Sequence, residues 1–371
     1  GAKGEADRFE LNAYALRAEE IAIEAEALIA QSVPGRAYWV EVRGEEEEAG
    51  GRGGRYGVRA TLACSPIEVA PLLKEHLFGQ EHSVVLTSAT MAVGHPPNRD
   101  RQGADTARNP TGPFTHAMAR LGCEGAATLL LGSPFDHATQ VELHIERSMQ
   151  RPEGGRNAAV PAPDELDQRD ASEVLSSLRA PVPPSVRVSP SYSSDLAARI
   201  LTHIDATGGG AFVLFTSFST LYAVADLLAP ALEDRGLPML IQGRGGPRSL
   251  ILQRFRDHEN SVLLGAASFW QGVDVRGRGL RNVIITKLPF DPPDRPLTEA
   301  RNELIKSRGG DPFRDDSLPR AVIKFKQGFG RLIRSRTDTG RVVVLDPRIV
   351  TTGYGRAFLE ALPAGVKVLD R

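Results

Sequence analysis

Residues 211–215 read Ala-Phe-Val-Leu-Phe, and this apolar run decides the fold. A helical pattern follows over about 218–234 and ends at Gly236, and the chain continues to alternate in this way. Strand patterns cover 239–242, 261–264, 283–287 and 341–345, and helical patterns cover 195–205, 247–256, 296–308 and 317–334. Short apolar runs separated by helices predict an α/β fold, with a parallel sheet covered by helices on both faces. In such a sheet the loops at the carboxyl ends of the strands carry the ligand site.

The chain before residue 150 has a mixed pattern. We expect an amphipathic helix over 9–31, a strand at 38–42, a Gly- and Glu-rich loop at 44–54 and a strand at 56–63. A helix is expected from Ser65 to about Phe78, followed by a buried strand at 83–87. Residues 150–190 contain seven prolines and little periodicity. They predict a linker or peripheral segment, and the main domain boundary is placed there.

Composition excludes several classes of protein. The chain has 371 residues and only 2 cysteines, which excludes a disulfide scaffold, a zinc ribbon and a four-cysteine iron–sulfur cluster within it. The absence of a long apolar run and of a signal-peptide pattern predicts a soluble, cytoplasmic protein. Residues 181–371 carry 27 Lys and Arg against 19 Asp and Glu, whereas residues 1–180 carry 18 against 27. A basic C-terminal half suits a polyanionic partner, although arginine-rich surfaces are also common.

The first candidate motif is Lys-Gln-Gly-Phe-Gly-Arg-Leu-Ile-Arg-Ser at 326–335. Gln327, Arg331 and Arg334 are spaced i, i+4, i+7 and would share one face of a helix. An amide and two guanidiniums on one face can bind a phosphate and stabilise the charge that develops in phosphoryl transfer. The alternative is a solvated helix face that happens to be basic.

A second motif, Gly-Ala-Ala-Ser-Phe-Trp-Gln-Gly-Val-Asp at 265–274, leaves a strand as a small-residue loop. Ser268 and the loop amides, Gly272 among them, can hold phosphates. Phe269 and Trp270 can stack on bases, and Asp274 can bind a ribose hydroxyl or one of the arginines. The alternative is a turn whose aromatic residues fill the core.

Two further strands end in hydroxyl groups. Thr216 and Ser217 follow the strand at 211–215, where their hydroxyls can donate to the phosphates of a single strand or cap the next helix. Ser88 and Thr90 end the predicted strand at 83–87, in the sequence Thr-Ser-Ala-Thr. Taken alone, this last signal is weak.

In this order, the segments TSAT, LFTSF, SFWQGVD and QGFGRLIRS resemble motifs III to VI of superfamily-two DNA helicases of the DinG/XPD type. The resemblance covers about 56–371 and implies two RecA-like domains with ATP bound between them. It also implies 5′→3′ unwinding along single-stranded DNA. The implied roles are catalytic at the γ-phosphate for Gln327, Arg331 and Arg334, cofactor binding for Ser268, Gly272 and Asp274, and coupling of hydrolysis to movement for Ser88 and Thr90.

The resemblance also implies a domain plan. Residues 1–55 would be an arch-derived helical segment with an acidic loop, and 56–149 the end of the first motor domain and a connection. Residues 150–190 would be the linker, and 191–371 the second RecA-like motor domain. The expected partners are single-stranded DNA or a forked duplex, and the first motor domain in cis or in trans.

Two departures limit what the resemblance implies. The 371 residues contain no Gly-x-x-x-x-Gly-Lys-Ser/Thr phosphate loop, so ATP and Mg²⁺ would be bound mainly by a portion absent from this chain. Gln271 also stands where the family more often has Glu. We therefore expect a partial motor, which begins with Gly rather than Met and hydrolyses little ATP alone. The alternatives are a non-catalytic nucleic-acid-binding or regulatory module, or one subunit of a split motor.

Overall fold

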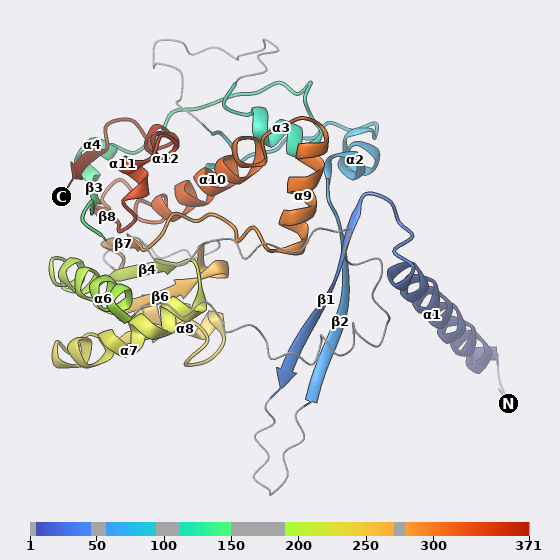
Figure 1. Cartoon of the computed structure of the whole chain (residues 1–371), viewed down its shortest axis with the longest axis horizontal. Helices are drawn as coiled ribbons and strands as arrows, with labels where there is room; N and C mark the ends of the chain where they lie inside the picture. The colour runs from blue at the N-terminus through green and yellow to red at the C-terminus, as the bar shows by residue number, and fades with distance from the viewer. Residues whose placement is uncertain (1–4, 46–56, 94–111, 150–189, 271–278, 371) are drawn as a thin grey trace, which may run out of the picture. The chain divides into compact units, whose positions relative to one another are not determined.

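The computed structural model describes residues 5–45, 57–93, 112–149, 190–270 and 279–370 (Figure 1). These residues fall into two compact units. One comprises residues from 1–92, 103–129 and 291–320, and the other residues from 93–102, 130–290 and 321–371. Of the predicted domain plan, the 150–190 boundary lies almost wholly outside the described residues.

The second unit is built on one parallel sheet of seven strands, in the order β5-β6-β4-β7-β8-β3-β9. In chain order the strands are β3 (Val141–Ile145), β4 (Ala211–Phe215), β5 (Met239–Ile241), β6 (Val262–Ala266), β7 (Asn282–Ile285), β8 (Gly340–Val344) and β9 (Lys367–Asp370). The predicted parallel sheet is therefore confirmed. β3 precedes the Pro-rich segment yet pairs between β8 and β9, so the sheet draws on chain from both sides of that segment.

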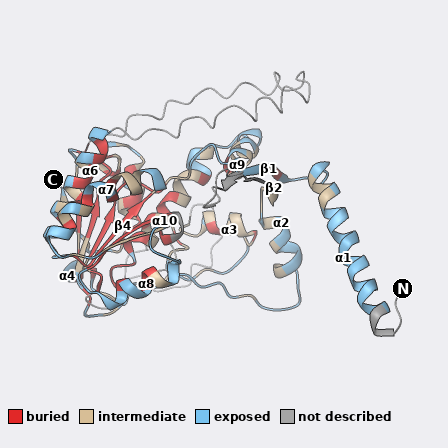
Figure 2. Ribbon diagram, turned by 90° about the horizontal axis from the view of Figure 1, so that it is seen from below, coloured by how far each residue is buried: buried red, intermediate tan, exposed pale blue. Residues whose placement is uncertain are grey.

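Alternate residues of β4 show how the two faces of the sheet are covered. Ala211, Val213 and Phe215 belong to the core cluster formed with α6 (Pro190–Asp205) and α7 (Phe218–Asp234). Phe212 faces the other way, toward Phe255 of α8 (Arg248–Asp257) at a ring-centroid distance of 6.4 Å. Every residue of β4 is buried (Figure 2). A strand buried on both faces is apolar throughout, which makes this run recognisable in the sequence.

The second unit also contains short helices and the longer α10. They are α4 (His137–Gln140), η3 (Ala267–Trp270), α10 (Leu318–Phe329, whose first turn belongs to the first unit), α11 (Arg348–Thr351) and α12 (Gly355–Glu360). The predicted helix at 317–334 ends earlier than expected, at Phe329, and the exposed Gly330 follows it.

The first unit contains a long antiparallel hairpin, β1 (Arg36–Glu45) with β2 (Gly57–Pro66). Its helices are α1 (Glu5–Ile29), α2 (Ala70–Leu73), η1 (Lys74–Phe78), α3 (Thr115–Leu121), α9 (Pro296–Ser307) and η5 (Phe313–Ser317). Arg301 and Arg308 of the α9 region fasten that helix to the chain after β2. The Arg301 Nε donates to the Ile67 carbonyl at 3.1 Å, and Arg308 pairs with Glu68 at 2.8 Å.

Three predictions for the first unit are wrong in detail. Residues 83–87 are not a strand, and Val85 is 82% exposed, because an apolar run needs a neighbouring strand to complete its hydrogen bonds. Pro66 ends β2 instead of opening a helix. The helix predicted over 9–31 forms as α1, but its apolar residues lie on several sides and Phe9, Leu16 and Ile23 are exposed.

Candidate functional site

The carboxyl ends of β4 and β6 meet at one edge of the sheet, where the predicted hydroxyl and aromatic residues gather. Thr216 and Ser217 follow β4 directly and are half-buried. The Ser217 Oγ accepts a hydrogen bond from the Thr220 amide at 3.3 Å and caps α7. Ser217 therefore caps α7, a role that is compatible with a phosphate contact because its hydroxyl can still donate a hydrogen bond.

Phe269 and Trp270 are buried rather than presented to a nucleic acid. Phe269 is 1% exposed and lies edge-on to Phe212 at 6.3 Å. Trp270 is 4% exposed, and its indole N–H donates to the Phe215 carbonyl at 2.8 Å. This burial argues against base stacking by either residue and agrees with the alternative, in which both rings fill the core.

Glycine is needed at two positions around these rings. A Cβ at Gly265 would lie 2.7 Å from the Phe269 Cβ, and one at Gly328 would lie 3.0 Å from the Trp270 Cζ3. Of the other predicted residues in this loop, Gly272 and Asp274, together with Gln271, lie outside the described residues. Ser268 lies in η3, but its side chain is also outside the description.

The three predicted catalytic residues do not form one helical stripe, so that prediction is wrong. Gln327 lies on α10 and is half-buried, whereas Arg331 and Arg334 come after the end of the helix at Phe329. Arg331 is 3% exposed, and Arg334 is exposed. The glycines at 328 and 330 favour this early end, because glycine has a low helix propensity.

The loop that carries Arg334 is held by a buried carboxylate. Asp338 accepts hydrogen bonds from the backbone amides of Arg334 and Ser335, each at 2.8 Å, and from the Ser335 hydroxyl at 2.7 Å. Gln140, also buried, donates its amide to the carbonyls of Ser335 at 3.1 Å and Asp338 at 2.8 Å. These bonds fix the backbone from which the exposed Arg334 side chain projects.

Arg331 lies beneath this loop among aromatic rings. Its guanidinium donates to the Trp270 carbonyl and lies 6.0 Å from the centre of the Phe212 ring. Burial lowers the pKa of Arg331 to about 10, and the positive charges of Arg334 and Arg248 contribute to the lowering. Arg248 in turn lies 5.2 Å from the centre of the Phe269 ring. Arg331 and Arg248 thus lie against the two rings of the Phe212–Phe269 pair, and guanidiniums suit an anion with several oxygens.

The chain is similar to known helicases. Residues 200–365 match the helicase C-terminal domain family. The chain is 34% identical over 354 residues to the ATP-dependent DNA helicase YoaA of Haemophilus influenzae, covering 95% of this chain and 44% of the relative. It is 32% identical over 330 residues to the 3′-5′ exonuclease DinG of Bacillus subtilis, covering 88% of this chain and 29% of the relative.

The chain is a C-terminal region of the DinG/XPD type of superfamily-two helicase. It spans less than half the length of these curated relatives. A solved XPD helicase structure superposes with a TM-score of 0.53 at 16% identity, covering 84% of this chain and 46% of that one. This likeness supports the RecA-like fold.

The predicted coupling residues of this helicase region lie in the first unit. The Ser88 hydroxyl accepts a hydrogen bond from the Thr90 amide at 3.1 Å, and the two hydroxyl oxygens are 3.4 Å apart. Ser88 is exposed and Thr90 half-buried. Their coupling role stays a prediction.

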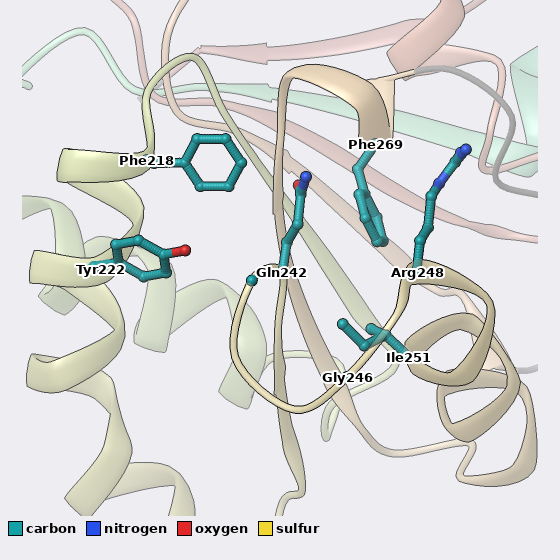
Figure 3. A pocket seen from close by; sticks show the side chains of 8 residues that line it. Phe218, Tyr222, Gln242, Gly246, Arg248, Ile251 and Phe269 are labelled. Atoms are coloured by element: carbon teal, nitrogen blue, oxygen red, sulfur yellow. The ribbon is translucent and has the colours of Figure 1, made fainter. Parts of the chain in front are cut away.

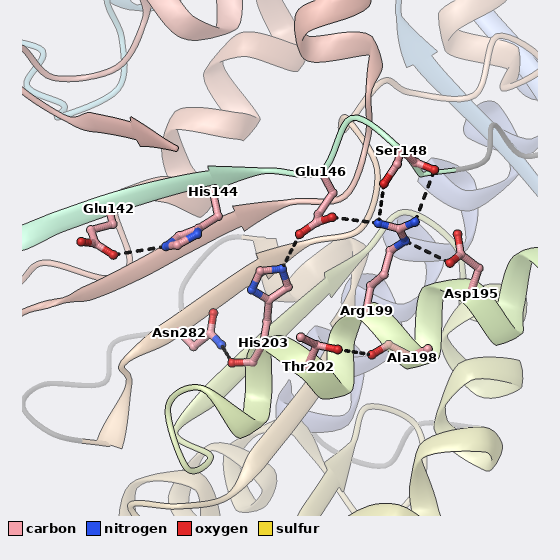
Figure 4. Close-up of polar contacts among 10 residues, drawn as sticks. All are labelled: Glu142, His144, Glu146, Ser148, Asp195, Ala198, Arg199, Thr202, His203 and Asn282. Carbon is pink, nitrogen blue, oxygen red and sulfur yellow. Dashed lines mark hydrogen bonds and ion pairs between the residues drawn. The ribbon is translucent and has the colours of Figure 1, made fainter. Parts of the chain in front are cut away.

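A second polar network, next to β3, has a structural role in the helicase fold (Figure 4). Glu146 accepts from His203 of α6 at 3.0 Å and pairs with Arg199 at 2.8 Å, and Arg199 also binds Asp195 at 3.0 Å. Burial lowers the pKa of His203 against the raising effect of the Glu146 carboxylate. The network fastens α6 to the strand that precedes the Pro-rich segment.

Sequence reasoning missed three residues that shape the candidate site. Arg248 opens α8 far from the arginine motif, Asp338 follows that motif, and Gln140 comes nearly two hundred residues earlier in the chain. Only Asp338 left a signal, since a carboxylate a few residues after Arg334 is placed to bind turn amides.

Proposed function

We propose that the natural full-length protein is an ATP-dependent DNA helicase that moves 5′→3′, and that this chain supplies the arginines that act on the ATP. The relatives named as ATP-dependent DNA helicases support the activity. One observation carries the role of this chain. The exposed Arg334 projects from a loop held by Asp338, three residues after the buried Arg331.

In hydrolysis, water attacks the γ-phosphorus and ADP leaves, while negative charge spreads over the γ-phosphate oxygens. Arg334 would donate hydrogen bonds to these oxygens as its charge stabilises them. Gln327 would contact the same phosphate. The Arg331 guanidinium is buried and donates to the Trp270 carbonyl. It would therefore have to give up this hydrogen bond before it could donate to a phosphate oxygen.

The residues available for the cofactor fit part of this scheme. Guanidiniums suit a triphosphate, and Ser268, Gly272 and Asp274 stay proposed contacts on the nucleotide side. Among the described residues, no group of three or more His, Cys, Asp or Glu could hold a metal ion. Because the sequence contains no Gly-x-x-x-x-Gly-Lys-Ser/Thr phosphate loop, ATP with Mg²⁺ would be held mainly by other residues. The two cysteines cannot supply a four-cysteine iron–sulfur cluster.

For the DNA, Thr216 and Ser217 would contact backbone phosphates of a single strand or a forked duplex. The excess of Lys and Arg over Asp and Glu in residues 181–371 supports a polyanionic partner. Ser88 and Thr90 would couple ATP hydrolysis to movement of the first motor domain, which would act in cis or in trans.

No described helix has the length and apolar character needed to cross a membrane. We propose that the protein acts in the cytoplasm.

The test is Arg334→Ala in the full-length protein, with Arg336→Ala as the matched control, since Arg336 is an exposed arginine two residues further on. We expect the kcat of DNA-stimulated ATP hydrolysis to fall by about 10³-fold or more, with a small change in ATP affinity. The control should keep the kcat of the unmodified protein. Equal kcat values for both variants would exclude the proposed role of Arg334. If the unmodified protein hydrolyses no ATP, the binding-module alternative is favoured.

A further inference from the structure

A pocket at the end of β5 has no role in the function proposed above, although Phe218 and Phe269 of its lining lie in two of the motifs (Figure 3). It has a volume of about 300 Å³, and its walls include Phe218, Tyr222, Gln242, Arg248, Ile251 and Phe269. All of its lining residues belong to the second unit. Figure 3 shows Phe218 and Tyr222 on one side of Gln242, and Phe269 and Arg248 on the other.

The aromatic side of the pocket belongs to the first turns of α7. The rings of Phe218 and Tyr222 are 5.8 Å apart, and Phe218 is 40% exposed although it is fully apolar. The Arg244 guanidinium lies 4.5 Å from the centre of the Tyr222 ring and pairs with Asp226 at 2.6 Å. These contacts hold Tyr222 in place, so the pocket presents an ordered aromatic wall to solvent.

The opposite side carries a guanidinium and a fixed amide. Arg248 lies over the Phe269 ring, whose burial leaves it little room to move. The Gln242 carboxamide oxygen accepts from the Ala266 amide at 2.7 Å, which sets the orientation of the whole group. None of the lining residues is acidic. A flat ligand would thus meet aromatic faces, a guanidinium and a directional amide.

The glycine-rich loop between β5 and α8 closes the pocket. Gly243 has a φ of +83°, and a Cβ there would lie 2.2 Å from the Tyr222 hydroxyl. Gly246 has a φ of +110°, which side-chain-bearing residues rarely adopt. The backbone can approach Tyr222 this closely only because position 243 lacks a side chain.

We infer that this pocket receives one unpaired base of a single-stranded DNA. Proteins recognise unstacked bases by stacking on aromatic rings and guanidinium planes, together with hydrogen bonds to the base edge. The pocket has these components in the rings of Phe218 and Tyr222, the Gln242 carboxamide, and the Arg248 guanidinium against the Phe269 ring. Phe218 also directly follows Thr216 and Ser217, so a strand whose phosphates lie at those hydroxyls would place a base near the pocket. This inference rests on the proposed DNA binding.

The test compares Phe218→Leu, which removes the ring but keeps apolar bulk, with Phe313→Leu. The control makes the same change at a residue with 38% exposure in the other unit. Binding of the 371-residue chain is measured by fluorescence anisotropy with two probes of equal length, an oligothymidylate and an oligomer of abasic sites. Far-UV circular dichroism confirms that both variants are folded.

We expect Phe218→Leu to weaken oligothymidylate binding by roughly 5- to 150-fold, the range for loss of one stacked base. Its affinity for the abasic probe should equal that of the unmodified chain, and Phe313→Leu should match the unmodified chain on both probes. An equal loss on both probes, or no loss on either, would overturn the inference. If the unmodified chain binds neither probe, the proposed DNA binding fails, and the inference fails with it.

A second measurement locates the base. An oligonucleotide carrying 5-iodouracil is cross-linked to the chain by ultraviolet light, and the modified peptide is identified by mass spectrometry. We expect the cross-link in the peptide that contains Phe218 and Tyr222, with a lower yield in Phe218→Leu. A cross-link confined to other peptides would assign the base to another site.

Discussion

Replacing Trp270 by Phe tests whether this residue stabilises the fold or binds DNA. The side chain is 4% exposed, and its N–H is bonded to the Phe215 carbonyl at 2.8 Å. Phenylalanine keeps one ring but leaves that buried carbonyl without its indole donor, which costs about 1–3 kcal/mol. The lost ring volume adds about 1 kcal/mol. We therefore expect the free energy of unfolding of the unit that contains the sheet to fall by about 2–4 kcal/mol.

The measurement is urea denaturation followed by far-UV circular dichroism, because tryptophan fluorescence would mix the signals of both Trp residues of the chain. Trp39→Phe is the control, since its indole donates at 3.3 Å to the exposed Glu41 carboxylate. There we expect a change within about 0.5 kcal/mol. Under native conditions the affinity of Trp270→Phe for single-stranded DNA should equal that of the unmodified chain. An unchanged denaturation midpoint with weakened DNA binding would refute the buried role of Trp270.

Two further predictions concern buried ionisable groups. Arg331→Met removes a buried charge whose pKa is lowered to about 10 from 12.5, which corresponds to a destabilisation of the fold by about 3 kcal/mol. The same substitution removes the hydrogen bond to the Trp270 carbonyl, which stabilises the fold by about 2–3 kcal/mol. We expect an unfolding free energy within about 1 kcal/mol of the unmodified chain by urea denaturation, and a loss of several kcal/mol would show that Arg331 stabilises the fold. Burial also lowers the pKa of His116, His137 and His203 from 6.5. As the pH falls, these histidines therefore bind protons more readily in the unfolded chain than in the folded chain. The free energy of unfolding should then fall as the pH is lowered from 7 to 5, and a rise over this range would contradict the assignment.

The sequence predicted the central strands well for a physical reason. A strand buried on both faces, such as β4, must be apolar at every position, and a helix must follow to bring the chain back to the next parallel strand. The same reasoning failed at 83–87, where the run is apolar but the described residues include no ladder partner for it. Local pattern alone did not distinguish these two cases.

The candidate site was harder to predict because it depends on where α10 ends. Spacing placed Gln327, Arg331 and Arg334 on one face, but the helix stops at Phe329 and the two arginines separate into a buried and an exposed group. The pocket left no signal of its own, since its walls come from α7, from the loop after β5, from α8 and from η3. Each segment has an ordinary role when considered alone.

The ring pair Phe212 and Phe269 has a guanidinium on each side, Arg331 against the first ring and Arg248 against the second. In a densely packed interior neither ring can shift without displacing its neighbour. A ligand that favours one conformation of Arg248 would therefore favour one conformation of Arg331. By thermodynamic reciprocity, a phosphate that binds Arg331 would change the affinity of the protein for that ligand. Through Phe212 and Phe269, the affinity of the pocket for DNA and the rate of ATP hydrolysis would then depend on each other.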